Sequence, residues 1–138
     1  MTLSIDIGVK NLGWSVISLK KELEFGLYDI SDIQKIPKSI KNMGIIHQRI
    51  WMLKQFIEEI CSKFDINKII IEKQINSNTV AMEIMYLLTT LCSEKVNIEN
   101  IIIYDPKKKF TDLKIKYDTR NKYHKKLSVK LISDLLRD

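Results

Sequence analysis

The chain begins with an apolar strand pattern that carries a single carboxylate and is followed closely by glycine. In residues 2–17, TLSIDIGVKNLGWSVI, apolar and polar side chains alternate up to Asp6, and a second strand-like run begins after a break at Gly13. This pattern predicts a hairpin with an acid on its first strand. A half-buried carboxylate loses hydration and needs a cation or hydrogen-bond donors in exchange. The leading candidate to replace this hydration at Asp6 is a metal ion.

The remaining pattern is that of one α/β domain, for which 138 residues provide a single core. A third short strand makes the opening an antiparallel meander, and a loop over 31–42 leads to the first helix. The predicted elements are two strands within 2–17, a strand over 24–30, a helix over 43–64, a strand over 68–72, a helix that starts at 76–79 and ends near 92, a strand over 101–104 and a helix over 123–136.

The first helix is amphipathic. Its apolar residues fall at steps of three and four, which predicts one buried stripe. The members of this stripe are Ile46, Ile50, Leu53, Ile57, Ile60, Cys61 and Phe64. Trp51 and Phe56 lie outside it, so we expect these two side chains to be able to pack on a second copy of the chain.

The two cysteines, Cys61 and Cys92, fall on apolar helix faces without a partner motif, which indicates buried reduced thiols. The first residues, MTLSIDIG, show no basic region before a long apolar segment, and no apolar run approaches the roughly 20 residues of a spanning helix. We therefore expect an intracellular protein of a reducing compartment such as the cytoplasm, neither secreted nor bound to a membrane.

The net charge of +6 is located in the last quarter of the chain. Residues 1–104 contain 12 Lys and Arg and 12 Asp and Glu, whereas residues 105–138 contain 11 and 5. A basic segment on a neutral body is expected of a protein that binds a polyanion, because each neutralised phosphate releases counterions. The alternative is a lysine-rich surface that serves solubility only.

A second carboxylate ends the predicted fourth strand. The uninterrupted run 69–71 indicates a strand covered on both faces, as in parallel pairing, and Glu72 follows it. In a sheet of this order the first strand commonly lies beside the fourth, with functional groups at their carboxyl ends. Asp6 and Glu72 would then repel unless a cation lay between them, and oxygen ligands suit Mg²⁺ or Mn²⁺. The pair predicts phosphodiester hydrolysis, in which two ions about 4 Å apart activate water and stabilise the leaving oxygen.

Two motifs resemble a known family. Residues 5–16, IDIGVKNLGWSV, are similar to the opening strand motif of the RuvC-like branch of the RNase H superfamily, and residues 70–74, IIEKQ, resemble its fourth-strand motif. The closest resemblance is to poxvirus-type Holliday junction resolvases, which share the Lys-Asn after the glycine and the Glu-basic-Gln triplet. This resemblance implies an α/β fold with an RNase H-like mixed five-stranded sheet, three antiparallel strands followed by parallel strands, flanked by helices.

The resemblance also implies a viral, metal-dependent endonuclease that resolves four-way (Holliday) DNA junctions as a homodimer, in the cytoplasm or a viral factory. By motif, Asp6 and Glu72 correspond to metal ligands, and Lys107 to a lysine near the scissile phosphate, so these three are the expected catalytic residues. The expected cofactor is Mg²⁺, with Mn²⁺ as a substitute. The expected DNA contacts are Lys10, Asn11, Lys73, Gln74, Lys107, Lys108, Lys109, Lys122, Lys125, Lys126 and Lys130.

The end of the chain departs from the pattern of this family, which completes its metal site with one or two aspartates on a final helix. Here the last predicted helix resembles the family's helix that precedes this final acidic helix, and the sequence ends at Asp138. Asp134 and Asp138 lie one turn apart and are the candidate substitutes. We expect one domain over residues 1–138 that lacks the final acidic helix, either as a truncated form or as a natural variant with an incomplete site.

Three functions remain open from the sequence. The first is a junction-resolving endonuclease, and the second is a catalytically impaired nucleic-acid-binding module of the same fold, which the missing carboxylates favour. The third is an actin-like or sugar-kinase phosphate-binding domain, which also opens with Asp-x-Gly but needs a second phosphate loop and a much longer chain. A RuvC-like fragment of an RNA-guided nuclease is disfavoured, because all the expected elements are continuous here.

Overall fold

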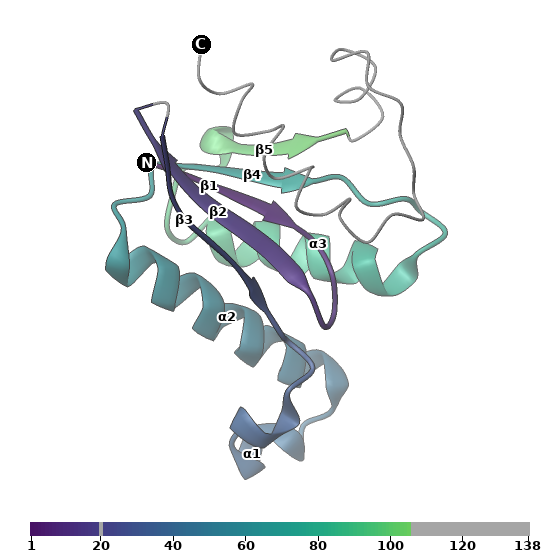
Figure 1. Ribbon diagram of the computed structural model, residues 1–138. Coiled ribbons are helices and arrows are strands. Elements are labelled where there is room, and N and C mark those ends of the chain that lie inside the picture. Colours follow the sequence, from purple (N-terminus) through teal and green to yellow (C-terminus); the bar gives the residue numbers. More distant parts are fainter. Residues whose placement is uncertain (20, 106–138) are drawn as a thin grey trace.

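A mixed five-stranded sheet with the order β3-β2-β1-β4-β5 forms the centre of the fold (Figure 1). The structure is a computed structural model and describes residues 1–19 and 21–105. The first three strands pair antiparallel, and β4 and β5 are parallel to β1, which confirms the predicted sheet. The strands are β1 (Thr2–Asp6), β2 (Leu12–Ser18), β3 (Lys21–Tyr28), β4 (Lys68–Glu72) and β5 (Ile101–Tyr104).

Two long helices, α2 (Ile45–Lys63) and α3 (Thr79–Cys92), lie on the same face of this sheet (Figure 1). Asn78 caps α3, because its side-chain oxygen accepts a hydrogen bond from the Ala81 N–H at 3.1 Å. No helix within the described ranges is long and apolar enough to cross a membrane. The predicted closing helix over 123–136 lies outside the described residues.

Three short helices complete the described part of the chain. They are η1 (Ile33–Lys35), α1 (Lys38–Lys41) and η2 (Ile98–Asn100). The prediction of a loop over 31–42 was therefore wrong in part, because η1 and α1 fall within it. Both elements are too short to show a helical period in the sequence, which is why the pattern did not reveal them.

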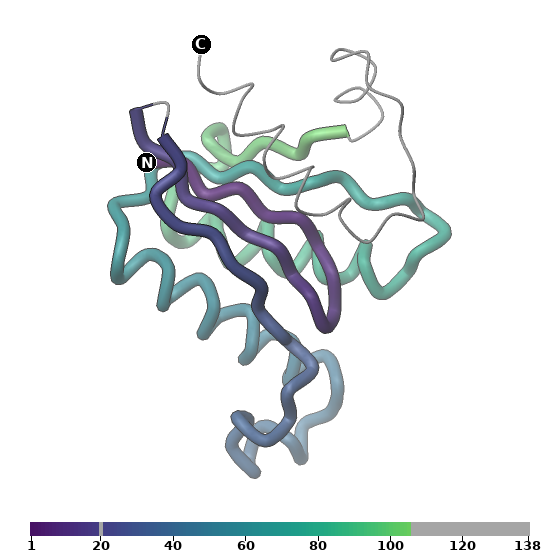
Figure 2. The backbone as a smooth tube through the Cα atoms, viewed as in Figure 1, coloured from purple at the N-terminus to yellow at the C-terminus, as the bar shows by residue number. Residues whose placement is uncertain are grey.

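Strand alternation divides the sheet into two faces of different chemistry. Leu3 and Ile5 point toward the helices and are fully buried, so Ser4 and Asp6 point to the opposite face. Each of these four side chains is buried. Residues 69–72 of β4 are likewise buried throughout, which confirms the strand covered on both faces that the apolar run predicted. Figure 2 shows the backbone of β1 running between β2 and β4.

The buried side of α2 differs from the predicted stripe. Phe56 lies in the core, with its ring centroid 6.3 Å from that of Trp14 and 5.1 Å from that of Tyr28, so the expectation that it packs on a second copy was wrong. Ile46 was expected in the core and is exposed. The apolar residues of α2 form more than one stripe, and the position of the sheet selects Met52, Leu53, Phe56, Ile57 and Ile60.

Both cysteines are free thiols, as predicted, but the expectation that both are buried was wrong for Cys61. Cys92 is buried on α3, whereas Cys61 on α2 is only half-buried. Burial raises the pKa of the Cys92 thiol to about 12, so this thiol stays protonated at neutral pH.

We expect Phe56→Ala to lower the free energy of unfolding by about 3–5 kcal/mol, because a large buried aromatic ring is replaced by a cavity. Ile46→Ala on the same helix is the matched control and should change it by less than about 0.5 kcal/mol, because this side chain is exposed. Urea unfolding followed by circular dichroism measures both. Equal losses for the two variants would contradict the orientation of α2.

Candidate active site

Asp6 and Glu72 lie side by side at the carboxyl ends of two neighbouring parallel strands. The register pairs Ile5 of β1 with Ile71 of β4, so the next residue of each strand is one of the two acids. Adjacent strands are about 4.8 Å apart, and residues in register point to the same face. Asp6 is 5% and Glu72 is 6% exposed. The structure therefore brings together the two carboxylates that the sequence predicted to meet.

The strands on either side, β2 and β5, place one residue each beside the two acids. Gly13 of β2 is paired with Asp6, and Tyr104 of β5 is paired with Glu72. A Cβ atom added at Gly13 would lie 3.7 Å from the Asp6 Cβ, within ordinary van der Waals contact, so the glycine lies directly beside the acid. The predicted break at Gly13 was wrong, because this residue lies within β2. Its pairing in the antiparallel ladder holds it in the strand.

Hydrogen bonds beyond the end of β4 fix the backbone around Glu72. The Lys73 N–H donates to the Tyr104 carbonyl oxygen at 2.7 Å, which extends the pairing with β5 by one residue. The Gln74 side-chain amide donates to the Glu72 carbonyl oxygen at 2.9 Å. Gln74, expected to contact DNA, thus holds the chain at Glu72 through its amide group.

The donor chemistry of the pair fits a hard divalent cation. Two buried carboxylates one strand spacing apart supply oxygen ligands and a local negative charge, as Mg²⁺ and Mn²⁺ prefer. No group of three or more His, Cys, Asp or Glu side chains suited to a metal occurs within residues 1–19 and 21–105. Mg²⁺ is commonly held by one or two carboxylates, with water and phosphate oxygens as its other ligands. Asp134 and Asp138, the candidate additional ligands, lie outside the described residues.

The other predicted contacts divide into two groups. Lys10 and Asn11 are exposed on the connection that leaves β1 after Asp6, and Lys73 is exposed directly after Glu72. These side chains border the acid pair at the same edge of the sheet. The members of the second group lie outside the described residues: Lys107, Lys108, Lys109, Lys122, Lys125, Lys126 and Lys130.

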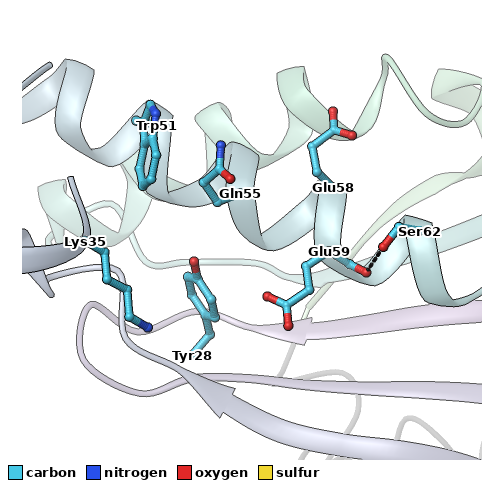
Figure 3. Close-up of a pocket in the computed structure, with 7 residues that line it drawn as sticks. All are labelled: Tyr28, Lys35, Trp51, Gln55, Glu58, Glu59 and Ser62. Carbon is cyan, nitrogen blue, oxygen red and sulfur yellow. Dashed lines mark hydrogen bonds between the residues drawn. The ribbon is translucent and has the colours of Figure 1, made fainter. Parts of the chain in front are cut away.

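A surface groove between β3 and α2 combines aromatic and acidic side chains (Figure 3). Burial, followed by the negative charges of Glu59 and Asp32, raises the pKa of the Tyr28 hydroxyl. Tyr28 contacts the ring of Phe56 on the helix-covered face of the sheet, whereas Asp6 points to the other face. The groove is therefore separate from the acid pair. No sequence motif indicated it, because its walls come from a strand and a helix that only the fold brings together.

The comparison with protein families shows to which family the chain belongs. A model described as "Poxvirus A22 protein" matches residues 1–136. The chain belongs to the poxvirus A22 protein family. This is the family of the poxvirus Holliday junction resolvases, so the resemblance carried by the two motifs is confirmed, and with it a resolvase nuclease function. None of the curated proteins shows a significant match to the chain.

Solved structures confirm the fold class of this A22-family chain. It is similar to RuvC of Thermus thermophilus in complex with a Holliday junction substrate, with a TM-score of 0.59, 15% identity and coverage of 95% of this chain and 91% of that one. A second Thermus thermophilus RuvC structure gives a TM-score of 0.56 at 14% identity, with coverage of 94% and 90%. At such low identity the likeness concerns the RNase H-like fold.

If Asp6 and Glu72 hold a divalent cation, Mg²⁺ or Mn²⁺ should stabilise the folded chain. At about 100 times the dissociation constant the gain is about 2.7 kcal/mol, which differential scanning fluorimetry detects as a higher Tm. Asp6→Asn and Glu72→Gln should abolish this shift. Asp65→Asn and Glu99→Gln change exposed acids elsewhere and should keep it. A shift that survives both site substitutions would show that the ion binds elsewhere.

Proposed function

We propose that this A22-family chain is a metal-dependent endonuclease that resolves four-way DNA junctions by hydrolysing phosphodiesters at Asp6 and Glu72. The observation that carries this proposal is the adjacent placement of the two buried carboxylates at the carboxyl ends of β1 and β4. Phosphodiester hydrolysis requires charge neutralisation at the phosphate and an activated water, and a carboxylate-bound divalent ion meets both needs. Membership in a resolvase family supports this chemistry over the two other functions that the sequence left open.

The role of Asp6 and Glu72 is to hold the ion in a fixed position. Both side chains belong to rigid, hydrogen-bonded strands, and burial limits their rotamers, which favours the positional precision that catalysis needs. Mg²⁺, or Mn²⁺ in its place, would supply Lewis acidity at the scissile phosphate when bound. Lys107 remains the predicted cation beside that phosphate.

Branched DNA is the proposed substrate. The exposed Lys10 and Lys73 flank the acid pair, and the positive charge of residues 105–138 supplies further phosphate-binding capacity. One of the similar solved structures is RuvC in complex with a Holliday junction substrate, which supports a junction as the ligand. The two free cysteines agree with a reducing compartment, as expected for a viral protein acting inside the infected cell.

We further propose that the chain acts as a homodimer through the outer face of α3. This helix contains one charged residue, Glu83, and Glu83 is paired with Arg49 of α2 at 2.8 Å. Its solvent side presents Tyr86, which is exposed, together with half-buried Met82 and Leu87. Surfaces that lack free charges and carry aromatic and aliphatic side chains are typical of interface centres. Two active sites in one dimer match the two strands that must be cut.

The decisive experiment is cleavage of a labelled four-way junction in Mg²⁺ or Mn²⁺. Asp6→Asn and Glu72→Gln should each lower the cleavage rate by at least about 10²-fold, because each removes charge that holds the ion, while junction binding measured in Ca²⁺ is retained. Asp65→Asn and Glu99→Gln are the matched controls and should cleave at the rate of the unaltered chain.

The outcomes of this assay separate the candidate functions. Cleavage that is unaffected by both site substitutions would refute the roles of Asp6 and Glu72. Binding of the junction without cleavage by the unaltered chain would select the DNA-binding module. A chain that neither binds nor cuts DNA would contradict both.

The dimer proposal predicts that Tyr86→Glu shifts the chain from dimer to monomer in sedimentation velocity experiments, because a charge would be buried at the centre of the interface. Tyr86→Phe keeps the ring and should leave the dimer intact. The chain should remain folded in both variants, since Tyr86 lies on the exposed side of α3. An unchanged sedimentation coefficient for Tyr86→Glu would exclude this face as the interface.

A further inference from the structure

The segment over residues 33–48, from η1 to the first turn of α2, combines positive charge with exposed apolar side chains. From residue 33 to residue 48 the chain contains no Asp or Glu but three exposed lysines, Lys35, Lys38 and Lys41. η1, α1 and the first turn of α2 fall within this stretch. Asp32, directly before this stretch, lies 4.0 Å from the Lys35 Nζ, so the positive charge of the surface rests on Lys38 and Lys41.

Several apolar side chains of this segment are not part of the core. Met43 is 54%, Ile45 is 57% and Ile46 is 49% exposed, and the three follow one another around Gly44. By contrast, Ile30 and Ile36 are buried in the main core and anchor the segment to the domain. Met43, Ile45 and Ile46 therefore form an exposed apolar surface next to the core. Exposed apolar surfaces commonly mark binding sites.

The segment leaves the sheet at the edge that carries the acid pair. The Ile30 N–H donates to the Val9 carbonyl oxygen at 3.1 Å, which ties the end of β3 to the connection that follows Asp6. In Figure 1, α1 lies beyond the end of β3. The segment therefore begins near the connection that follows Asp6.

We propose that Met43, Ile45 and Ile46 contact bases exposed at the branch point of a DNA junction, while Lys38 and Lys41 bind the adjoining phosphates. This inference rests on the proposed function and deepens it, because it names the residues that distinguish a junction from plain duplex. Apolar side chains that enter between bases gain contacts where stacking is already broken, whereas in an intact duplex they must first unstack a step. The lysines add sequence-independent affinity for phosphate.

The charge of the segment argues for DNA over a second copy of the chain. An isologous dimer interface brings the same patch of both copies together, so the lysines of one copy would approach those of the other, and residues 33–48 contain no acid that could pair with them. An anionic membrane surface has the same charge complementarity, but it would not explain why the segment adjoins the edge with Asp6 and Glu72.

The test compares binding of a four-way junction with binding of a duplex of equal length, by fluorescence anisotropy in Ca²⁺. The triple variant Met43→Ala, Ile45→Ser and Ile46→Ser should bind the junction about five- to tenfold more weakly and the duplex with unchanged affinity. It should also lose the increase in 2-aminopurine fluorescence from a probe at the crossover. Lys38→Ala with Lys41→Ala should weaken both complexes and reduce the salt slope of binding by about 2. Ile98→Ser, at the opposite end of the sheet, should change neither affinity.

Three results would overturn the inference. These are junction binding by the triple variant equal to that of the unaltered chain, a shift of the triple variant to monomer in sedimentation, and loss of binding to phosphatidylserine vesicles with junction binding intact. In each case Asp6-dependent cleavage by the unaltered chain would leave the proposed function standing. If the unaltered chain neither binds nor cuts the junction, the proposed function fails as well.

Discussion

The parallel pairing of β1 with β4 is the interaction on which the rest of the structure depends. It joins two strands separated in the chain by β2, β3, η1, α1 and α2, and it places both in the interior of the sheet. There Leu3, Ile5, Ile69 and Ile71 form one layer of the core. The same register puts Asp6 beside Glu72. A shift of one residue would turn one acid into the apolar core, so core packing and site geometry are specified by a single alignment.

The two faces of the sheet differ in chemistry: one is apolar and the other carries buried polar side chains. The face toward α2 and α3 is apolar, and Phe56 closes it against Trp14 and Tyr28. The opposite face carries Ser4, Asp6, Ser15 and Glu72, all buried, in the middle of the sheet. Two neighbouring buried carboxylates supply the oxygen ligands that a hard divalent cation prefers, which is the physical reason for expecting a cation there. The apolar core and the proposed chemistry thus lie on opposite sides of the same strands.

The carboxyl edge of β1 and β4 is where the proposed substrate would bind. Exposed lysines border the acid pair, and the positively charged segment over 33–48 begins at the same edge, held by the hydrogen bond between Ile30 and Val9. An arrangement in which hydrolysis and recognition of branched DNA use one edge of the sheet would let a small single-core domain act on a large substrate.

The sequence by itself determined the order of the strands and long helices up to residue 105, the position of Asp6 and Glu72 at strand ends, and the family. These features depend on local periodicity and short motifs, which each stretch carries independently of the others. Only the tertiary structure decided which side of α2 faces the sheet, because its apolar residues form overlapping stripes and the choice between Ile46 and Phe56 depends on what lies opposite. It also decided that Gly13 continues a strand, since pairing with Asp6 outweighs the local preference of glycine for a break. Contacts between distant segments set both outcomes, and no pattern within a single segment records them.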